Sequence, residues 1–371
     1  MKAVLGRSLV ALLLTLPMAA CAAQSAPPRS AESPASESIA AAAVFPATEW
    51  DKIADPASAG YCQDKLDLVT ARAKDLPTTA MMAVVGGRVL YDYGDVTTVS
   101  YLASVRKSVL AMMFGNSVAS GAIRLDKTLA DLKIDDHGGL LETEKRATVA
   151  DLLGARSGVY HEASNSGDNL ADAPPRGSQK PGTYFLYSNW DFNALGTIFE
   201  QETGQNIYDA LERDLVRPIG MQDFDRSTHR RTGDAKKSMH LAYHMNFSTR
   251  DMGRLGYLML RQGNWNGQQL VPRDWARRIV SVVTPVHEMN PANNRKGPFG
   301  YGYLWWVWDG EAAKGPFEGA YSGRGAIGQY ITVLPTLDLV IAHKTRPGSG
   351  SVSWGQYTEL VDRLVAARCR D

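Results

Sequence analysis

The sequence predicts an α+β fold in which both ends of the chain build one antiparallel sheet and a helical lobe is inserted between them. Three observations favour this class. A hairpin pattern lies near the start, helical periodicity dominates the middle, and segments rich in β-branched and aromatic residues return near the end. Clefts form where such lobes meet, so we expect the functional site at their junction.

The individual elements follow from local patterns. Residues 63–75 have helical periodicity, residues 81–93 form a hairpin around Gly86-Gly87, and a helix is predicted over 104–119. The α/β lobe therefore covers about 46–120 and 285–371, and the helical lobe about 121–284. Further helices are predicted over 148–153, 188–202, 207–216, 248–262, 272–282 and 354–368, and strands over 301–308, 318–323, 329–334 and 339–343.

Composition excludes several classes of protein. The 371 residues carry 40 basic and 39 acidic side chains, so the net charge is +1 and no nucleic-acid partner is expected. With 44% hydrophobic and 21% charged residues, the chain can bury a large core.

The first 21 residues have the pattern of a secretory signal. Lys2 and Arg7 precede an apolar run over 9–14, and small residues lead to Cys21. The run is too short to be a stable membrane anchor. Residues 18–21 also resemble a bacterial lipobox, so two outcomes remain open, plain cleavage or lipidation of Cys21.

Residues 22–45 are predicted to be a disordered linker, because they are rich in Ala, Ser, Pro and Glu and poor in large apolar side chains. We therefore expect an exported protein, either periplasmic or lipid-anchored at the bacterial cell envelope through Cys21, with a single domain over 46–371. The sequence leaves its oligomeric state open.

Two cysteines remain after processing, Cys62 and Cys369. An exported protein folds under oxidising conditions, so a disulfide between the first and last helices is favoured, with two buried free thiols as the alternative. Such a bridge would stabilise the fold by about 4 kcal/mol in the chain-entropy description.

Ser104-Val105-Arg106-Lys107 is the first candidate catalytic motif. Positions i and i+3 share a helix face, so Lys107 can approach the Ser104 hydroxyl and activate it if burial lowers the lysine pKa. The motif fixes only two positions and is expected about once by chance in a chain of this length. The alternative is a helix-capping serine followed by a surface lysine.

A second motif, Tyr187-Ser188-Asn189, ends a loop and opens a helix. The Tyr187 phenol can exchange a proton with Ser104, and the Asn189 amide can contact substrate. The alternative is a core tyrosine and a capping asparagine.

Together these motifs resemble the penicillin-recognising serine hydrolases, in particular the branch of class C β-lactamases, D-alanyl-D-alanine peptidases and related esterases. The resemblance covers roughly residues 50–368, and segments such as Gly182-Thr183 and Gly328-Gln329-Tyr330 share it. It implies a β-lactamase/transpeptidase-like fold, Ser104 as nucleophile, Lys107 and Tyr187 as proton carriers, and no cofactor. It also implies an oxyanion hole made by the backbone N–H groups of Ser104 and Gly323.

The family's third motif, a Lys- or His-Thr-Gly on an edge strand, is not matched. Its position falls within residues 320–324, where neither Lys nor His precedes the glycine. Lys344-Thr345 lies one strand too late. Arg324 either replaces the missing cation or is a solvated turn residue, and Ser322, Arg324 and Asn189 are the candidate substrate-binding residues.

Other site classes are disfavoured. His240 and His244 have metal-like spacing, but no acidic base or third ligand accompanies them, so no metal is expected. His161 is interpreted as a loop residue, and only one of Trp305 and Trp306 is expected to reach a pocket.

The sequence thus predicts a serine hydrolase that cleaves a small-molecule carboxylic ester or amide through an acyl-enzyme on Ser104. A β-lactamase or D-alanyl-D-alanine peptidase is the alternative among enzymes. A non-catalytic cell-wall binding or sensor protein on the same fold is the alternative of another class.

Overall fold

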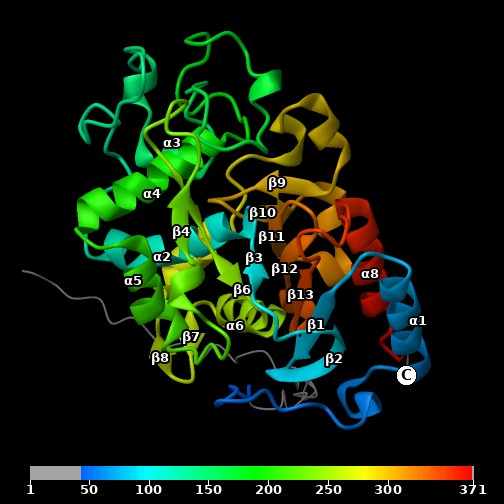
Figure 1. The fold of residues 1–371 in the computed structure, drawn as a ribbon. Helices are drawn as coiled ribbons and strands as arrows, with labels where there is room; N and C mark the ends of the chain where they lie inside the picture. Colours follow the sequence, from blue (N-terminus) through cyan, green and yellow to red (C-terminus); the bar gives the residue numbers. More distant parts are fainter. Residues whose placement is uncertain (1–42, 370–371) are drawn as a thin grey trace, which may run out of the picture. The chain divides into compact units, whose positions relative to one another are not determined.

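The computed structural model describes residues 43–369, which fall within one compact unit. Its centre is a seven-stranded antiparallel sheet in the order β2-β1-β13-β12-β11-β10-β9 (Figure 1). The N-terminal hairpin joins the C-terminal strands where β1 pairs with β13, so the sheet is built from both ends as predicted. The strands are β1 (Ala80–Val85), β2 (Arg88–Gly94), β9 (Phe299–Tyr301), β10 (Trp306–Trp308), β11 (Tyr321–Gly325), β12 (Gln329–Leu334) and β13 (Leu339–Lys344).

Two terminal helices, α1 (Gln63–Lys74) and α8 (Trp354–Ala366), pack together beside one face of the sheet (Figure 1). Helix α8 begins with a capping box formed by Ser353 and Gln356, which satisfies backbone N–H groups at its first turn. The predicted disulfide joins Cys62 to Cys369, with Cα atoms 5.3 Å apart. It links the start of α1 to the end of α8.

Helices α2 (Val105–Ala119) and α6 (Thr249–Leu260) contact the sheet strands from within the large core cluster. Helix α6 lies directly on β12 and β13, and Gly256 permits this approach because an added Cβ would clash with Val340. Helix α2 contacts β11, the strand that should carry the third motif.

The middle of the chain forms the predicted helical lobe, with short ribbons between its helices (Figure 1). Its helices are α3 (Val149–Leu153), α4 (Asn189–Thr203), α5 (Ile207–Leu211) and α7 (Arg273–Ile279). Three two-stranded ribbons accompany these helices. They pair β3 (Ser100–Tyr101) with β6 (Asn246–Phe247), β4 (Arg230–Thr232) with β5 (Ala242–His244), and β7 (Asn264–Trp265) with β8 (Gln268–Gln269). Single-turn 3₁₀ helices lie at Pro56–Ala59, Glu144–Arg146, Leu170–Asp172, Arg226–Thr228, Val286–Glu288, Ala292–Lys296, Gly310–Ala313, Gly315–Phe317 and Pro335–Leu337.

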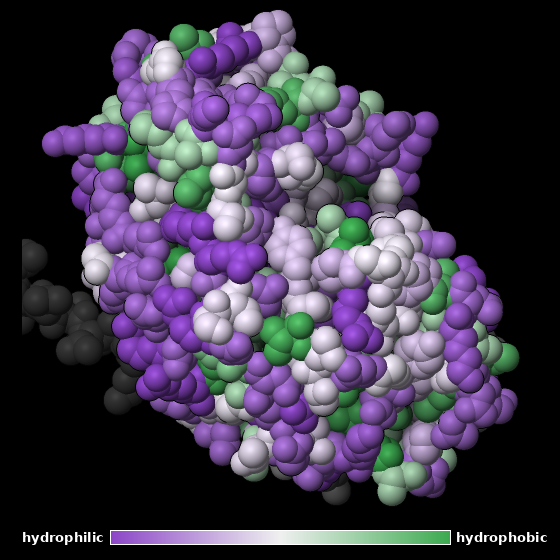
Figure 2. Space-filling view, viewed as in Figure 1, coloured by the Kyte–Doolittle hydropathy of each residue, from purple (hydrophilic) through white to green (hydrophobic). Residues whose placement is uncertain are grey.

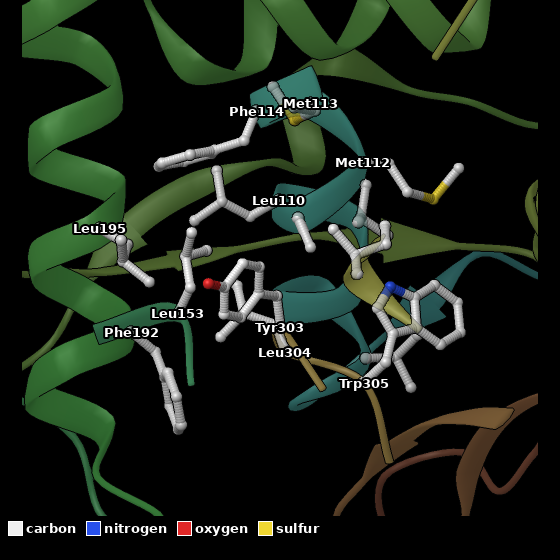
Figure 3. Close-up of a cluster of buried hydrophobic side chains, with 14 of the residues drawn as sticks. Leu110, Met112, Met113, Phe114, Leu153, Phe192, Leu195, Tyr303, Leu304 and Trp305 are labelled. Carbon is white, nitrogen blue, oxygen red and sulfur yellow. The ribbon is translucent and has the colours of Figure 1, made fainter. Parts of the chain in front are cut away.

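A shared core fixes the two lobes to each other around α2. Figure 3 shows side chains from α2, α3 and α4 meeting Tyr303, Leu304 and Trp305. Leu110 and Phe114 are fully buried there. Each such side chain stabilises the fold by about 1.5–3 kcal/mol through burial. Helix α2, which carries the Ser104 motif, is therefore packed against both the sheet and the helical lobe.

Three predicted elements need correction. The single strand over 301–308 is two strands, β9 and β10, separated by a turn in which Leu304 has a positive φ of 62°. The strand over 318–323 begins instead at Tyr321 and runs to Gly325. The helix over 207–216 is α5 followed by a π-helical turn, Glu212–Val216.

The predicted signal at 1–21, the lipobox cysteine and nearly all of the linker lie outside the described residues. The last linker residues are an exception, because Val44 donates its backbone N–H to Gly86 and Phe45 packs on Tyr257 and Trp265. The folded part therefore begins slightly earlier than composition suggested. Within residues 43–369, no helix has the length and apolar character needed to cross a membrane.

Candidate active site

Ser104 lies at the N-terminus of α2, where β3 leads into the helix. The preceding residue, Ala103, has a positive φ of 49°, an uncommon conformation for a residue with a Cβ. The Ser104 side chain makes no capping hydrogen bond to the helix. The alternative of a helix-capping serine is therefore excluded, and the hydroxyl is free to interact with Lys107.

Lys107 lies one helical turn beyond Ser104 and is 1% exposed, so it is not the surface lysine of the alternative interpretation. Its Nζ is 2.9 Å from Ser104 Oγ, 2.7 Å from the Tyr187 hydroxyl and 2.6 Å from Asn189 Oδ1. The Asn189 oxygen can only accept a hydrogen bond. A neutral amine that donates to Asn189 and Tyr187 keeps a lone pair for the Ser104 proton.

Tyr187 and Asn189 reach this cluster from the start of α4, as the sequence predicted. The Tyr187 ring packs against Phe192 and Trp306, with centroids 4.8 and 5.6 Å away. Asn189 is 1% exposed, and its Nδ2 donates to the Ser166 carbonyl oxygen at 2.8 Å. Both ends of the Asn189 amide are thus occupied by the protein, so this residue orients Lys107 and is not free to contact substrate.

Burial and nearby charge shift the pKa values of this cluster. Burial, aided by the Arg106 charge, lowers the pKa of Lys107 well below its usual value, and Asp168 opposes this. Burial raises the pKa of Tyr187 to about 12, although its hydrogen bond with Ser104 acts in the other direction. The amine therefore has access to its neutral form, while the phenol keeps its proton.

A cavity of about 300 Å³ opens onto Ser104 and Tyr187. Among residues 43–369, no acidic side chain lines it, and Arg324 is its one cationic residue. Its lining consists of Ser104, Gly167, Tyr187, Trp306, Arg324, Gly325, Ala326, Ile327, Tyr330, Ser351, Val352, Ser353 and Trp354. The molecular face in Figure 2 is mostly hydrophilic, with hydrophobic residues scattered over it.

Comparison with known proteins assigns the chain to a family. The family model described as Beta-lactamase matches residues 65–346, most of the chain. The chain belongs to the beta-lactamase family. A relative from Alkalihalophilus pseudofirmus, described only as an uncharacterized protein, is 23% identical over 268 residues, covering 65% of this chain and 71% of that protein.

Solved structures share the fold of this family member. A beta-lactamase from Mycobacterium bovis superimposes with a TM-score of 0.58 at 20% identity, covering 81% of this chain and all of that one. EstCE1, described as a hydrolase with promiscuous acyltransferase activity, superimposes with a TM-score of 0.59 at 16% identity, covering 83% of this chain and 98% of that one. A penicillin-binding protein homolog from Caulobacter crescentus superimposes with a TM-score of 0.58 at 15% identity, covering 83% of this chain and 99% of that one. These findings confirm the family resemblance and the α+β fold predicted from the sequence.

The third-motif region differs from the prediction in this beta-lactamase-family chain. Ser322 is fully buried, and its hydroxyl bonds with Thr332 Oγ1 at 3.0 Å. Gly323 packs under α2, where an added Cβ would lie 3.0 Å from Ser108 Oγ. Neither residue lines the cavity, so the predicted roles of Ser322 in substrate binding and Gly323 in the oxyanion hole need correction.

The cavity is lined instead by the end of β11 and the residues after it. An added Cβ on Gly325 would lie 2.6 Å from the Leu102 carbonyl oxygen, so the strand meets the Ser104 segment there. Strand β10 pairs with β11 only at Tyr321 and Ser322. Residues 324–326 therefore present an open backbone edge beside Ser104.

Arg324 lies in the cavity wall and is not a solvated turn residue. Its guanidinium carbon is 4.2 Å from the Trp354 ring centroid and 4.4 Å from that of Trp306. Burial lowers the pKa of Arg324 to about 10, which leaves it cationic at neutral pH. A guanidinium stacked on aromatic faces keeps N–H groups at its edge for an anion.

The disfavoured candidates lie apart from the cavity. Lys344 is buried and donates to the carbonyl oxygens of Ser100 and Phe247. His161 and His240 bond to backbone oxygens, and no group of three potential metal ligands occurs within the described range. Trp306 lines the cavity and Trp305 does not, as expected for this pair.

Sequence reasoning missed the part of the cavity contributed by the start of α8. Trp354 and the segment 351–353 line it, although no motif marks them. Tyr330 belongs to a segment that shares the family resemblance, but only the pairing of β12 with β11 and β13 places it in the same cavity as Ser104.

Proposed function

We propose that this protein is a serine hydrolase that cleaves a carboxylic ester or amide through an acyl-enzyme on Ser104. The observation that carries the proposal is the buried Lys107 amine, which lies within hydrogen-bond distance of both Ser104 Oγ and the Tyr187 hydroxyl. A nucleophile, a base and a proton carrier in mutual contact are what acyl transfer requires.

The chemistry follows from this arrangement. Ser104 Oγ attacks the substrate carbonyl while its proton passes to Lys107, and Tyr187 relays a proton to the leaving alcohol or amine. The Ser104 N–H and one N–H of the open β11 edge hold the oxyanion. A water molecule, deprotonated by the same Lys107 and Tyr187 pair, then attacks the acyl-enzyme and releases the acid.

A β-lactamase or D-alanyl-D-alanine peptidase is the second candidate, and Arg324 is the observation that favours it. The substrates of such enzymes carry a carboxylate, and a cation in the cavity would pair with that group. The Mycobacterium bovis and Caulobacter crescentus structures, described as a beta-lactamase and a penicillin-binding protein homolog, share the fold.

Intact-protein mass spectrometry separates these functions. The wild-type protein and Ser104→Ala are incubated with p-nitrophenyl butyrate and, separately, with a penicillin. A butyryl adduct or rapid p-nitrophenol release that depends on Ser104 supports the esterase. A long-lived penicilloyl adduct supports the peptidase, and fast penicillin turnover the lactamase. A non-catalytic binding protein would give no adduct with either compound, and that result would refute the proposed activity.

We also propose that the protein is exported. The Cys62–Cys369 disulfide supports this, because such bridges persist in oxidising compartments. Fractionation of cells that express the full chain or Cys21→Ala tests it. Export with membrane association that Cys21→Ala abolishes supports a lipid tether, and soluble periplasmic protein in both cases supports plain cleavage. Cytoplasmic protein in both would refute export.

A further inference from the structure

Arg106 is a buried cation beside the candidate base. It is the second residue of α2, directly before Lys107, and only 1% of it is exposed. Its guanidinium donates to the Ala103 carbonyl oxygen and to Asn193 Oδ1, both at 3.3 Å, while its Nε has no partner. Within residues 43–369, Arg106 forms no ion pair.

This placement is unfavourable for the stability of the fold. A buried charge without a counter-charge is costly, and a cation in the first turn of a helix opposes the helix dipole. The partial compensation comes from two carbonyl oxygens and from the face of Tyr243, whose centroid lies 5.1 Å from the guanidinium carbon. A neutral side chain of similar length would remove these costs, so the charge calls for another explanation.

The surroundings of Lys107 supply that explanation. The negative charge of Asp168 raises the pKa of Lys107 and so favours the protonated amine. The positive charge of Arg106 acts with burial to lower the pKa of Lys107. Arg106 also acts to lower the pKa of Tyr187, against the effect of burial on the phenol. The polar and charged groups around Lys107 and Tyr187 are Ser104 and Arg106 from α2, Asp168 from the preceding loop, Asn189 from α4, Tyr243 from β5, Tyr301 from β9 and Arg324 from β11.

We propose that Arg106 is a positioning residue whose unbalanced positive charge keeps Lys107 in the neutral, proton-accepting form. The inference rests on the proposed acyl-enzyme function. Arg106 acts through space on Lys107 and touches neither the cavity nor a substrate. Because the two charges are buried, their repulsion is only weakly screened by salt.

Hydrogen bonds also connect Arg106 through Asn193 to the loop that lines the cavity. Asn193, which accepts from Arg106, is fully buried and donates from Nδ2 to Asn165 Oδ1 at 2.8 Å. Asn165 begins the loop that reaches Gly167 in the cavity. A purely structural role for Arg106 would therefore alter this loop and substrate binding, but would not change the pH at which Lys107 loses its proton.

The test is the pH profile of kcat/KM with p-nitrophenyl butyrate, whose acidic limb reports deprotonation of the base in the free enzyme. Arg106→Gln removes the charge, and Arg106→Lys keeps it. Asn193→Asp leaves Arg106 in place but gives it a carboxylate partner, so it also tests the idea if Arg106→Gln does not fold. Circular dichroism and thermal unfolding confirm the fold of each variant.

We expect the acidic limb to move up by about one pH unit in Arg106→Gln and in Asn193→Asp, with kcat/KM reduced about tenfold at pH values below the limb. In Arg106→Lys the limb should stay within about 0.3 pH units of the wild type. An unmoved limb in the folded charge-neutralising variants, or an equal shift in Arg106→Lys, would overturn the inference. Activity that persists in Ser104→Ala would instead overturn the proposed function, so the two failures are distinguishable.

Discussion

Replacing Lys107 by Met is the most direct test of the proposed mechanism. Met preserves the length and apolar stem of the side chain, but it removes the three contacts of Nζ at 2.6–2.9 Å. General-base catalysis contributes about 10²–10⁴-fold. Because the same amine also holds the Tyr187 hydroxyl, we expect kcat/KM to fall by about 10⁴, which corresponds to about 5.4 kcal/mol in the barrier.

The fold should survive this change. Three hydrogen bonds are lost at about 1 kcal/mol each, but the cost of burying an amine is removed with them. The free energy of unfolding should therefore change by less than about 2 kcal/mol.

The assay compares p-nitrophenyl butyrate hydrolysis and urea unfolding of Lys107→Met with those of Lys344→Met. Lys344 is a matched buried lysine whose amine contacts two backbone oxygens outside the cavity. The control should keep kcat/KM within about threefold of the wild type. Activity of Lys107→Met within tenfold of the wild type would refute the reasoning.

Further expectations concern the cavity cation, the disulfide and a buried histidine. Arg324→Gln should lower kcat/KM for mono-p-nitrophenyl adipate about 10- to 100-fold while its methyl ester changes less than threefold; equal losses would argue against anion recognition. Cys62→Ser should lower the free energy of unfolding by about 4 kcal/mol in non-reducing urea titrations, and an unchanged midpoint would contradict this. Burial lowers the pKa of His343 from 6.5 to about 4, so the unfolded chain binds a proton between these pH values that the native state does not. Stability should therefore fall as the pH drops from about 6.5 to 4, and a flat unfolding midpoint over that range would disprove the assignment.

The sequence was sufficient where function depends on local spacing. Ser104 and Lys107 are one helical turn apart, and that periodicity alone places them on one face. The start of α4 follows from the pattern around Tyr187 in the same way. Burial of Lys107 is a tertiary property, so the sequence could state it only as the condition under which the amine activates Ser104.

The sequence was insufficient where strand register decides the geometry. Glycines stand at 323, 325 and 328, and composition does not tell which one meets the Ser104 segment. The pairing of β11 with β12, and the start of β10 only at Trp306, select residues 324–326. Asn189 was misjudged for a related reason. Its side-chain partners, Lys107 and the Ser166 carbonyl, lie far away in the sequence.

The bridge between Cys62 and Cys369 encloses nearly all of the folded chain in a covalent ring, since the two residues are 307 positions apart. A protease that nicks a surface loop anywhere inside this ring leaves both fragments joined. The nicked molecule would migrate as two bands only after reduction, and it would keep Ser104, Lys107 and Tyr187 on connected pieces. For the exported hydrolase proposed above, such tolerance to chain scission would prolong the working lifetime of the enzyme among foreign peptidases.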